Sequence, residues 1–401
     1  MPIRLRLPLV TTIVALMATL SATAGSVGQA AEPRFLLAHY MPWFEGRPVS
    51  AHWGWHWTMQ AFDPEQQING QPSIASHFHP LIGPYDSSDP AVLEFHLLTM
   101  KLAGIDGVIV DWYGLTSFRD YAVLHRNTTR LLETAERLQM KFVICYEDQT
   151  IPALVAGNRL AAEGRVRHAA TEIEWLGKYW FKSPSYLKLG GKPVLLSFGQ
   201  TGLTDAEWTA CLELAGEPVA YFSQQLRRSS ADGAFDWPTP SETLPALDRF
   251  YRESPAWPAS IPVAFPRFKD IYAEAKVGPS YGRFDDDGGR SFRSLLERAL
   301  RTKAPIVQIA TWNDWGEGTL VEPSVEFGYR DLEATQELRR RHLERQFPHG
   351  SEELRLPLEI HRARRQSPSE SERKALDRIV EQIVAGDVAA AAQALRARRD
   401  R

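Results

Sequence analysis

Residues 304–319 read APIVQIATWNDWGEGT. The first seven form an apolar run typical of a buried β-strand, and the next nine hold two carboxylates, Asp314 and Glu317, among tryptophans, glycines and an asparagine. Paired carboxylates suit cleavage of a glycosidic bond, because one group can move a proton at the leaving oxygen while the other activates or supplies the nucleophile. The same residues also suit a plain strand-to-helix turn in which Asn313 or Asp314 caps the following segment. This segment alone leaves both interpretations open.

Similar apolar runs recur along the chain and alternate with helical patterns. Several runs have apolar residues at successive positions, as parallel strands buried on both faces do. Eight strands alternating with helices predict an α/β fold, a parallel (β/α)8 TIM barrel, and an open doubly wound sheet is the alternative. No Gly-x-Gly-x-x-Gly follows the first run, so nothing supports a dinucleotide site. The predicted strands are residues 35–40, 106–112, 141–146, 193–198, 218–222, 234–237, 262–266 and 305–311.

Polar and aromatic residues gather at the carboxyl ends of five of these runs. In a barrel those ends meet at one rim, where active sites are built, so residues far apart in the sequence would share one cleft. A single charged residue after a strand is often only a loop contact, but five enriched ends favour a carbohydrate site. The five ends are HYMPWF at 39–44, DWYG at 111–114, YEDQ at 146–149, SFGQ at 197–200 and TWNDWGEGT at 311–319.

Aromatic and polar residues at these ends are the candidates for sugar contacts. Exposed tryptophan and tyrosine faces stack on sugar rings, although most such side chains in proteins fill cores. Packing at the barrel rim is therefore the alternative for each candidate. The predicted substrate-binding residues are Tyr40, Trp43, Asp111, Trp112, Tyr113, Glu147, Trp312, Asn313 and Trp315.

The first thirty residues have the pattern of a secretory signal peptide. Arg4 and Arg6 precede a short apolar run, and small residues follow it. The apolar run is too short for a membrane anchor, so we expect an exported protein, periplasmic or extracellular, with no membrane attachment after cleavage. The predicted organisation is a signal peptide at 1–30, a catalytic barrel at 31–348, and a polar linker with two C-terminal helices at 349–401. Those helices are expected near 367–384 and 387–398, and Ser369 and Glu372 suit a capping box at the first. Nothing in the sequence indicates the oligomeric state.

Charge and cysteine content exclude several classes of partner. Removal of the signal peptide changes the formal net charge from −3 to −5, and a mildly acidic chain without a basic block is a poor nucleic-acid binder. Cys145 and Cys211 are too few for a disulfide framework, and we expect buried thiols. The histidines of HWGWHW at 52–57 lack supporting acids and cysteines. The acidic run at 285–289 lacks the spacing of a calcium loop and suggests a solvated turn. We therefore predict no metal and no cofactor.

Three of the quoted pieces carry a resemblance to a known family. They are HYMPWF at 39–44, GIDGVIVDWYG at 104–114, and WNDWGEGT at 312–319 with Glu322 and Pro323. With these pieces in this order, the chain resembles the family 99 glycoside hydrolases and their wider 71/99-like relatives, from residue 35 to about residue 330. The resemblance implies a (β/α)8 enzyme that cleaves α-1,2-linked mannose chains internally and with retention of configuration.

The resemblance also implies separate roles for the two carboxylates. In the family, one carboxylate deprotonates the 2-hydroxyl of the sugar, which attacks the anomeric carbon to give a 1,2-anhydro sugar. A second carboxylate protonates the leaving oxygen and later activates water. Glu317 matches this second position, the acid/base, and Asp314 matches the carboxylate that engages the 2-hydroxyl. The family usually has glutamate where this chain has Asp314, which is one methylene shorter.

Three functional hypotheses follow. The first is an exported retaining glycoside hydrolase acting on an oligo- or polysaccharide. The second is a carbohydrate-binding barrel with impaired catalysis, which the aspartate at position 314 would also suit. The third is a glycan-processing transglycosylase linked to polysaccharide export. The sugar, the linkage and the choice between endo and exo action are not encoded in any motif that we recognise.

Overall fold

The structure is a computed structural model that describes residues 33–366 and 368–399, so the predicted signal peptide lies outside the described residues. Nine parallel strands form one continuous path of hydrogen-bonded neighbours, in the order β10-β9-β8-β7-β5-β4-β1-β14-β11. All eight predicted strands are present, and the predicted barrel is confirmed. The strands are β1 (Phe35–Tyr40), β4 (Gly107–Trp112), β5 (Lys141–Glu147), β7 (Lys192–Phe198), β8 (Ala220–Gln224), β9 (Gly233–Phe235), β10 (Ala259–Ile261), β11 (Val263–Ala264) and β14 (Ile306–Ile309).

The seventh strand of the barrel is split in two by Pro262. Strand β10 pairs with β9, whereas β11 pairs with β14, and Pro262 alone separates β10 from β11. Proline has no N–H to give to a sheet, but the carbonyl of Pro262 still accepts a hydrogen bond from the Gln308 amide at 3.0 Å. Strands β10 and β11 therefore fill one position between β9 and β14, and the nine strands occupy the eight positions of a TIM barrel.

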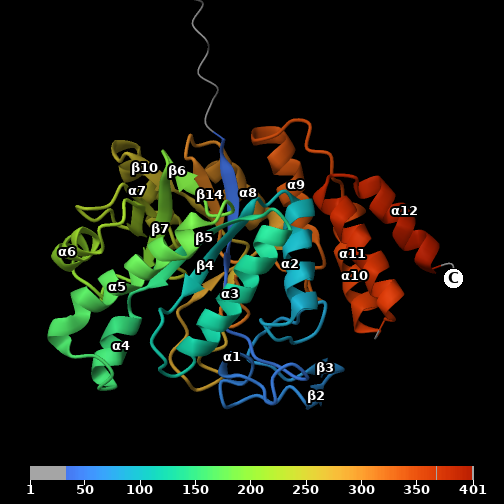
Figure 1. Cartoon of the computed structure of the whole chain (residues 1–401), viewed down its shortest axis with the longest axis horizontal. Helices are drawn as coiled ribbons and strands as arrows, with labels where there is room; N and C mark the ends of the chain where they lie inside the picture. Colours follow the sequence, from blue (N-terminus) through green and yellow to red (C-terminus); the bar gives the residue numbers. More distant parts are fainter. Residues whose placement is uncertain (1–32, 367, 400–401) are drawn as a thin grey trace, which may run out of the picture. The chain divides into compact units, whose positions relative to one another are not determined.

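Helices cover the outside of the barrel (Figure 1). Helix α2 shows how the sequence sets their ends: the Asp89 side chain accepts from the Ala91 amide, Pro90 takes the first helical position, and Gly104 ends the helix with a φ of 82°. The barrel helices are α2 (Pro90–Ala103), α3 (Tyr121–Arg137), α4 (Thr150–Ala156), α5 (Arg165–Lys178), α6 (Asp205–Ala215), α7 (Thr243–Glu253), α8 (Arg290–Leu300) and α9 (Arg330–His342).

The carboxyl ends of the barrel strands carry the longest irregular segments. The loop after β1 contains helix α1 and strands β2 and β3, which lie at the lower edge of Figure 1. Its aromatic residues form a small core of their own, in which Phe44, Trp57 and Tyr85 pack against Trp315 from the loop after β14. The short elements are α1 (Trp55–Thr58), β2 (Gln67–Ile68), β3 (Gln71–Pro72), β6 (Lys188–Leu189), β12 (Phe268–Lys269) and β13 (Arg283–Phe284), and the short 3₁₀ helices are Ala162–Gly164, Trp180–Lys182, Ser254–Ala256, Asp287–Gly289 and Glu353–Arg355.

Three helices follow the barrel: α10 (Leu356–Arg365), α11 (Glu370–Val384) and α12 (Val388–Arg399). The last two are the predicted C-terminal helices, and the predicted capping box between Ser369 and Glu372 is confirmed. Helix α10 lies within the predicted polar linker, and it packs beside α2. The linker prediction missed it because the apolar residues that it buries are interrupted by charged ones. The division between barrel and C-terminal segment at residue 349 stays a prediction.

No helix in the described part of the chain combines the length and the apolar character that crossing a bilayer requires. Cys145 and Cys211 are buried free thiols, as predicted.

Candidate active site

The two carboxylates predicted to be catalytic stand on the turn that leaves β14. The Asp314 amide donates to Oγ1 of Thr311 at 2.7 Å, and the Glu317 amide donates to Oδ1 of Asp314 at 3.0 Å. The Gly318 amide donates a hydrogen bond to the Asp314 carbonyl at 3.0 Å, which completes the turn. Asp314 therefore caps its own turn, whereas Oε2 of Glu317 is buried and has no hydrogen-bond partner within the described residues.

The two carboxyl groups have different electrostatic surroundings. Burial raises the pKa of Glu317 well above its ordinary value, and the charges of Asp314 and Asp270 raise it further, while a hydrogen bond from Tyr272 opposes the rise. Burial also raises the pKa of Asp314, to about 6, but the backbone amides of Glu317 and Gly316 stabilise its charged form. The pKa of Glu317 is therefore raised by burial and by neighbouring charges together, whereas amide hydrogen bonds limit the rise at Asp314. Such a separation divides acid and base roles in enzymes that use two carboxylates.

Two further carboxylates lie at the carboxyl ends of neighbouring strands: Asp111 is the penultimate residue of β4, and Glu147 is the last residue of β5. Burial raises the pKa of Asp111 well above its ordinary value, and the charge of Asp314 adds to this. Burial likewise raises the pKa of Glu147, and the charge of Asp111 adds to it. Oδ1 of Asp111 and Oε1 of Glu147 are buried without a hydrogen-bond partner among the residues described. The rim therefore offers several unpaired carboxyl oxygens, which suit the hydroxyl groups of a sugar.

A cleft of about 730 Å³ opens beside Glu147. Tyr113, a predicted sugar contact, lines it together with Trp55, whose side chain is 43% exposed and free to stack on a ring. Aromatic walls with a few polar groups are typical of sugar-binding clefts. The lining residues are Trp55, His56, Tyr113, Arg119, Asp120, Tyr121, Glu147, Gln149, Thr150 and Ala153. Trp43 lies behind this wall, half-buried and stacked on His56 with ring centroids 4.2 Å apart.

Two other predicted contacts, Tyr40 and Trp315, belong to a buried hydrogen-bond network beneath the turn. The Tyr40 hydroxyl bonds to Nδ1 of His96 at 2.9 Å, and Nε2 of His96 lies 3.0 Å from the Glu322 carboxylate. Nε1 of Trp315 donates to the same carboxylate at 3.2 Å. Tyr40 and Trp315 have no solvent-exposed surface. In this structure they support the turn from below.

The remaining three candidates are also fully buried. Asn313 ties the turn to the loop after β1, because its Oδ1 accepts from the Met41 amide at 2.8 Å. Trp312 directly precedes Asn313, and its Nε1 has no hydrogen-bond partner in the described part of the chain. Trp112 points away from the rim: it donates to His125 of α3 at 3.2 Å and stacks on Trp175 of α5. The structure thus brings Asp111, Glu147, Asp314, Glu317 and Tyr113 to the carboxyl-end rim, and it does not bring Trp112 there.

The sequence prediction missed Asp270 and Tyr272, which face Glu317. They follow β12 in a short irregular segment whose backbone pairs with the turn: the Ile271 amide donates to the Gly316 carbonyl at 3.0 Å. Neither residue stands at the end of a recognisable strand, and no spacing connects them with residues 314–317. No sequence signal that we used could have found them.

No group of three or more His, Cys, Asp or Glu side chains within residues 33–366 and 368–399 is arranged to hold a metal ion. His56 instead lies 3.4 Å from Asp120 through its Nε2 atom.

A TIM barrel with two carboxyl groups on one turn at its carboxyl-end rim, and with an aromatic cleft at the same rim, is an arrangement that suits a glycoside hydrolase. Comparison with known proteins agrees: the model of glycosyl hydrolase family 99 matches residues 33–236. The glycoprotein endo-alpha-1,2-mannosidase of Rattus norvegicus is 35% identical over 328 residues, which are 73% of this chain and 68% of that protein. The corresponding protein of Mus musculus is 24% identical over 336 residues, with the same two coverages. The chain belongs to glycosyl hydrolase family 99.

Among solved structures, the GH99 endo-alpha-mannosidase from Bacteroides thetaiotaomicron has the same fold. Its TM-score is 0.57 at 19% sequence identity, and the match covers 80% of this chain and 98% of that one.

Proposed function

We propose that this protein hydrolyses α-linked mannosides with retention of configuration, with Glu317 as the general acid/base and Asp314 engaging the sugar 2-hydroxyl. The observation that carries the proposal is the pair of buried carboxyls on one turn, of which Glu317 is the more readily protonated. Two mammalian relatives are endo-α-1,2-mannosidases, and this supports α-1,2-linked mannose as the substrate class.

The proposed chemistry has two steps. In the first, the Asp314 carboxylate takes the proton of the 2-hydroxyl, the freed oxygen attacks the anomeric carbon, and protonated Glu317 gives its proton to the departing oxygen. The glycosidic bond breaks and a 1,2-anhydro sugar forms. In the second, the Glu317 carboxylate takes a proton from water, the water oxygen opens the strained ring at the anomeric carbon, and protonated Asp314 returns its proton to O2. Two inversions at one carbon give net retention.

Asp111, Glu147 and Tyr113 are the proposed sugar contacts at the rim. The unpaired oxygens of Asp111 and Glu147 can accept hydrogen bonds from sugar hydroxyls. The exposed face of Trp55 offers a stacking surface in the adjoining cleft. This assignment extends the site from the catalytic turn toward Glu147.

The test is incubation of the full chain with α-linked manno- and gluco-oligosaccharides, with NMR identification of the first anomer released. We expect cleavage of α-1,2-linked mannose with the α anomer appearing first, and initial release of the β anomer would overturn the mechanism. Glu317→Gln should lower kcat by about 10²- to 10⁴-fold, and Asp314→Asn should abolish turnover, while both variants retain affinity for the oligosaccharide. Binding without cleavage by the unaltered chain would instead identify a carbohydrate-binding barrel. Products longer than the substrate in the presence of an acceptor sugar would identify a transglycosylase.

We propose in addition that the protein is exported to the periplasm or beyond. The support is the basic start, short apolar run and small residues of the first thirty positions. N-terminal sequencing of the protein recovered outside the cytoplasm should give a first residue near position 31. Recovery of the full-length chain from the cytoplasm alone would contradict export.

A further inference from the structure

Arg267 is a buried arginine, 3% exposed, that lies next to the turn carrying Glu317. Its Nη1 donates to the Leu320 carbonyl at 2.7 Å, and its Nη2 donates to the Asp331 carboxylate at the first turn of α9. Its guanidinium also lies over the ring of Phe327, 3.7 Å from the centroid. A charge this deeply buried is costly unless it is paired and hydrogen-bonded. Both Nη atoms and the face of the guanidinium are paired with groups of the segment after the turn, whereas Nε makes no hydrogen bond within the described residues.

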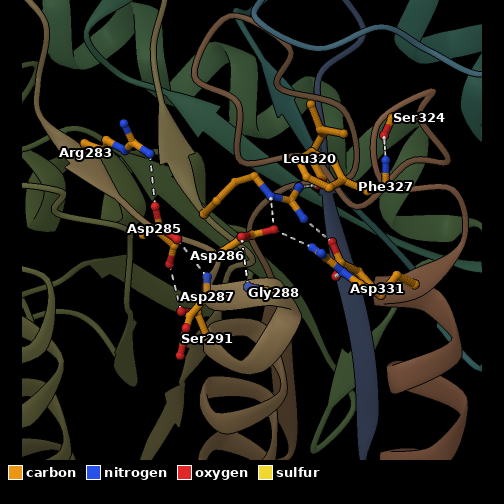
Figure 2. Close-up of polar contacts among 12 residues, drawn as sticks. Arg283, Asp285, Asp286, Asp287, Gly288, Ser291, Leu320, Ser324, Phe327 and Asp331 are labelled. Atoms are coloured by element: carbon orange, nitrogen blue, oxygen red, sulfur yellow. Dashed lines mark hydrogen bonds and ion pairs between the residues drawn. The ribbon is translucent and has the colours of Figure 1, made fainter.

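Asp286 and Arg330 complete a four-residue network around this guanidinium, together with Asp331. Arg330 donates to Asp286 at 2.6 Å and to Asp331 at 3.1 Å, and Nε of Arg267 lies 3.8 Å from Asp286. Figure 2 shows Asp286 beside Asp331, with Leu320 and Phe327 close by. The acidic run at 285–289 is therefore only partly the solvated turn that its sequence suggests. Asp286 binds two arginines, whereas Asp285 and Asp287 remain exposed.

The segment that starts at Arg267 also holds the catalytic turn through its backbone. The Lys269 amide donates to the Glu317 carbonyl at 2.9 Å, and the Ile271 amide donates to the Gly316 carbonyl at 3.0 Å. The two segments approach so closely that a Cβ on Gly318 would lie 2.8 Å from the Lys269 carbonyl oxygen. Three residues after Glu317, the Leu320 carbonyl accepts the hydrogen bond from Arg267. Residues 316–320 are thus held to one segment at three carbonyls, those of Gly316, Glu317 and Leu320.

We propose that Arg267 is a positioning residue for Glu317: it anchors the carboxyl end of the catalytic turn to the network of Asp331, Asp286 and Arg330. This role rests on the proposed function of Glu317 as the acid/base. Because an error of about 1 Å in a catalytic group can cost about 100-fold in rate, loosening this anchor should slow the reaction without removing any group that touches the sugar. A lysine at position 267 keeps the charge but cannot bond the Leu320 carbonyl and Asp331 with the geometry of a guanidinium fork.

The chain offers a matched control in Arg339. Its guanidinium also bonds a backbone carbonyl, that of Gly104 at 2.6 Å, pairs with Asp106 at 2.9 Å, and lies over the Phe347 ring. Gly104 and Asp106 precede β4, at the amino end of the barrel. Arg339→Lys therefore disrupts an equivalent set of contacts at the opposite rim.

The experiment compares Arg267→Lys with Arg339→Lys in the full chain, with Asp331→Asn as a second way to loosen the anchor should Arg267→Lys fail to fold. We expect both arginine variants to unfold at lower temperature. Only Arg267→Lys should lower kcat, by about 10- to 100-fold with little change in KM. Equal kcat in folded Arg267→Lys and in the unaltered chain would overturn the proposal, as would an equal loss of kcat in Arg339→Lys.

A second measurement does not depend on turnover. The carboxyl ¹³C signal of Glu317, assigned through Glu317→Gln, reports its titration among the groups that face it, Asp314, Asp270 and Tyr272. If the turn loosens, the carboxyl gains water, so its pKa should fall in Arg267→Lys and stay unchanged in Arg339→Lys. Identical titrations in the unaltered chain and Arg267→Lys would overturn the positioning role. Failure of the unaltered chain to cleave any α-mannoside would overturn the proposed function instead, and the titration would still decide the role of Arg267.

Discussion

Replacing Asp314 with asparagine should stabilise the protein at alkaline pH while abolishing its activity. Burial raises the pKa of Asp314 in the folded chain from 3.8 to about 6. Between these values the folded state binds a proton that the unfolded state has released, so stability falls as the pH rises from about 4 to about 6. At about 1.4 kcal/mol for each pH unit, the loss reaches about 3 kcal/mol above pH 6. Asparagine has nearly the same shape and no charge, and its side-chain oxygen can still accept from the Glu317 amide.

We therefore expect Asp314→Asn to be more stable than the unaltered chain by roughly 1 to 3 kcal/mol at pH 8, and equal to it near pH 4. Urea-induced unfolding at a series of pH values between 4 and 8 measures this difference directly. Asp285→Asn is the control, because Asp285 is exposed and its pKa is lowered by hydrogen bonds from Asp287 and Arg283, so its loss should bring no gain at pH 8. Lower stability of Asp314→Asn than of the unaltered chain at pH 8 would refute the claim that burial of the ionised Asp314 carboxylate costs stability.

Three shorter predictions concern the same turn. Activity should follow a bell-shaped pH profile, with an acid limb near pH 6 from ionisation of Asp314 and a loss at higher pH as Glu317 releases its proton; a flat rate between pH 4 and pH 6 would contradict the acid limb. Gly318→Ala should destabilise the fold by about 1 to 2 kcal/mol because the residue has a φ of 70°, and it should lower kcat because the new methyl group meets Lys269; differential scanning calorimetry and initial rates measure the two effects. Asp314→Glu, although it restores the residue usual in the family, should lower kcat because the longer side chain cannot keep its hydrogen bond to the Glu317 amide in a site only 4% exposed; a gain in kcat would show that the turn adapts to either length.

The barrel could be predicted from the sequence because its strands are short apolar runs that alternate with helical patterns. The position of the two carboxylates at the carboxyl end of a strand could be predicted because Asp314 and Glu317 lie close together in the chain and follow such a run. The apolar character of the strands also limited the prediction of which side chains face the cleft. A strand that is apolar on both faces has no alternation to show which side chains point inward, so Tyr40 and Trp112 were candidates for the cleft although both point toward the helices.

Contacts between distant segments could not be predicted from the sequence for a different reason. Arg267 and Asp331 are 64 residues apart, and each is unremarkable in its own surroundings. Asp270 and Tyr272 reach Glu317 only because two irregular segments pair through their backbones. Helix α10 was missed because its apolar residues matter only once α2 is in place beside it. These features are set by packing between elements, which local pattern does not record.

The break at Pro262 gives the barrel wall a preferred place to open. Everywhere else the wall is a continuous ladder, but here β10 follows β9 and β11 follows β14, with no amide at the residue between them. Local opening free energies are lowest where few hydrogen bonds join neighbouring segments. Amide protons of residues 259–264 should accordingly exchange with solvent faster than those of β1, β4 and β5. This break lies next to β14. The strand that leads to the turn of Asp314 and Glu317 therefore pairs with the uninterrupted strand β1 on one side and with the short strand β11 on the other.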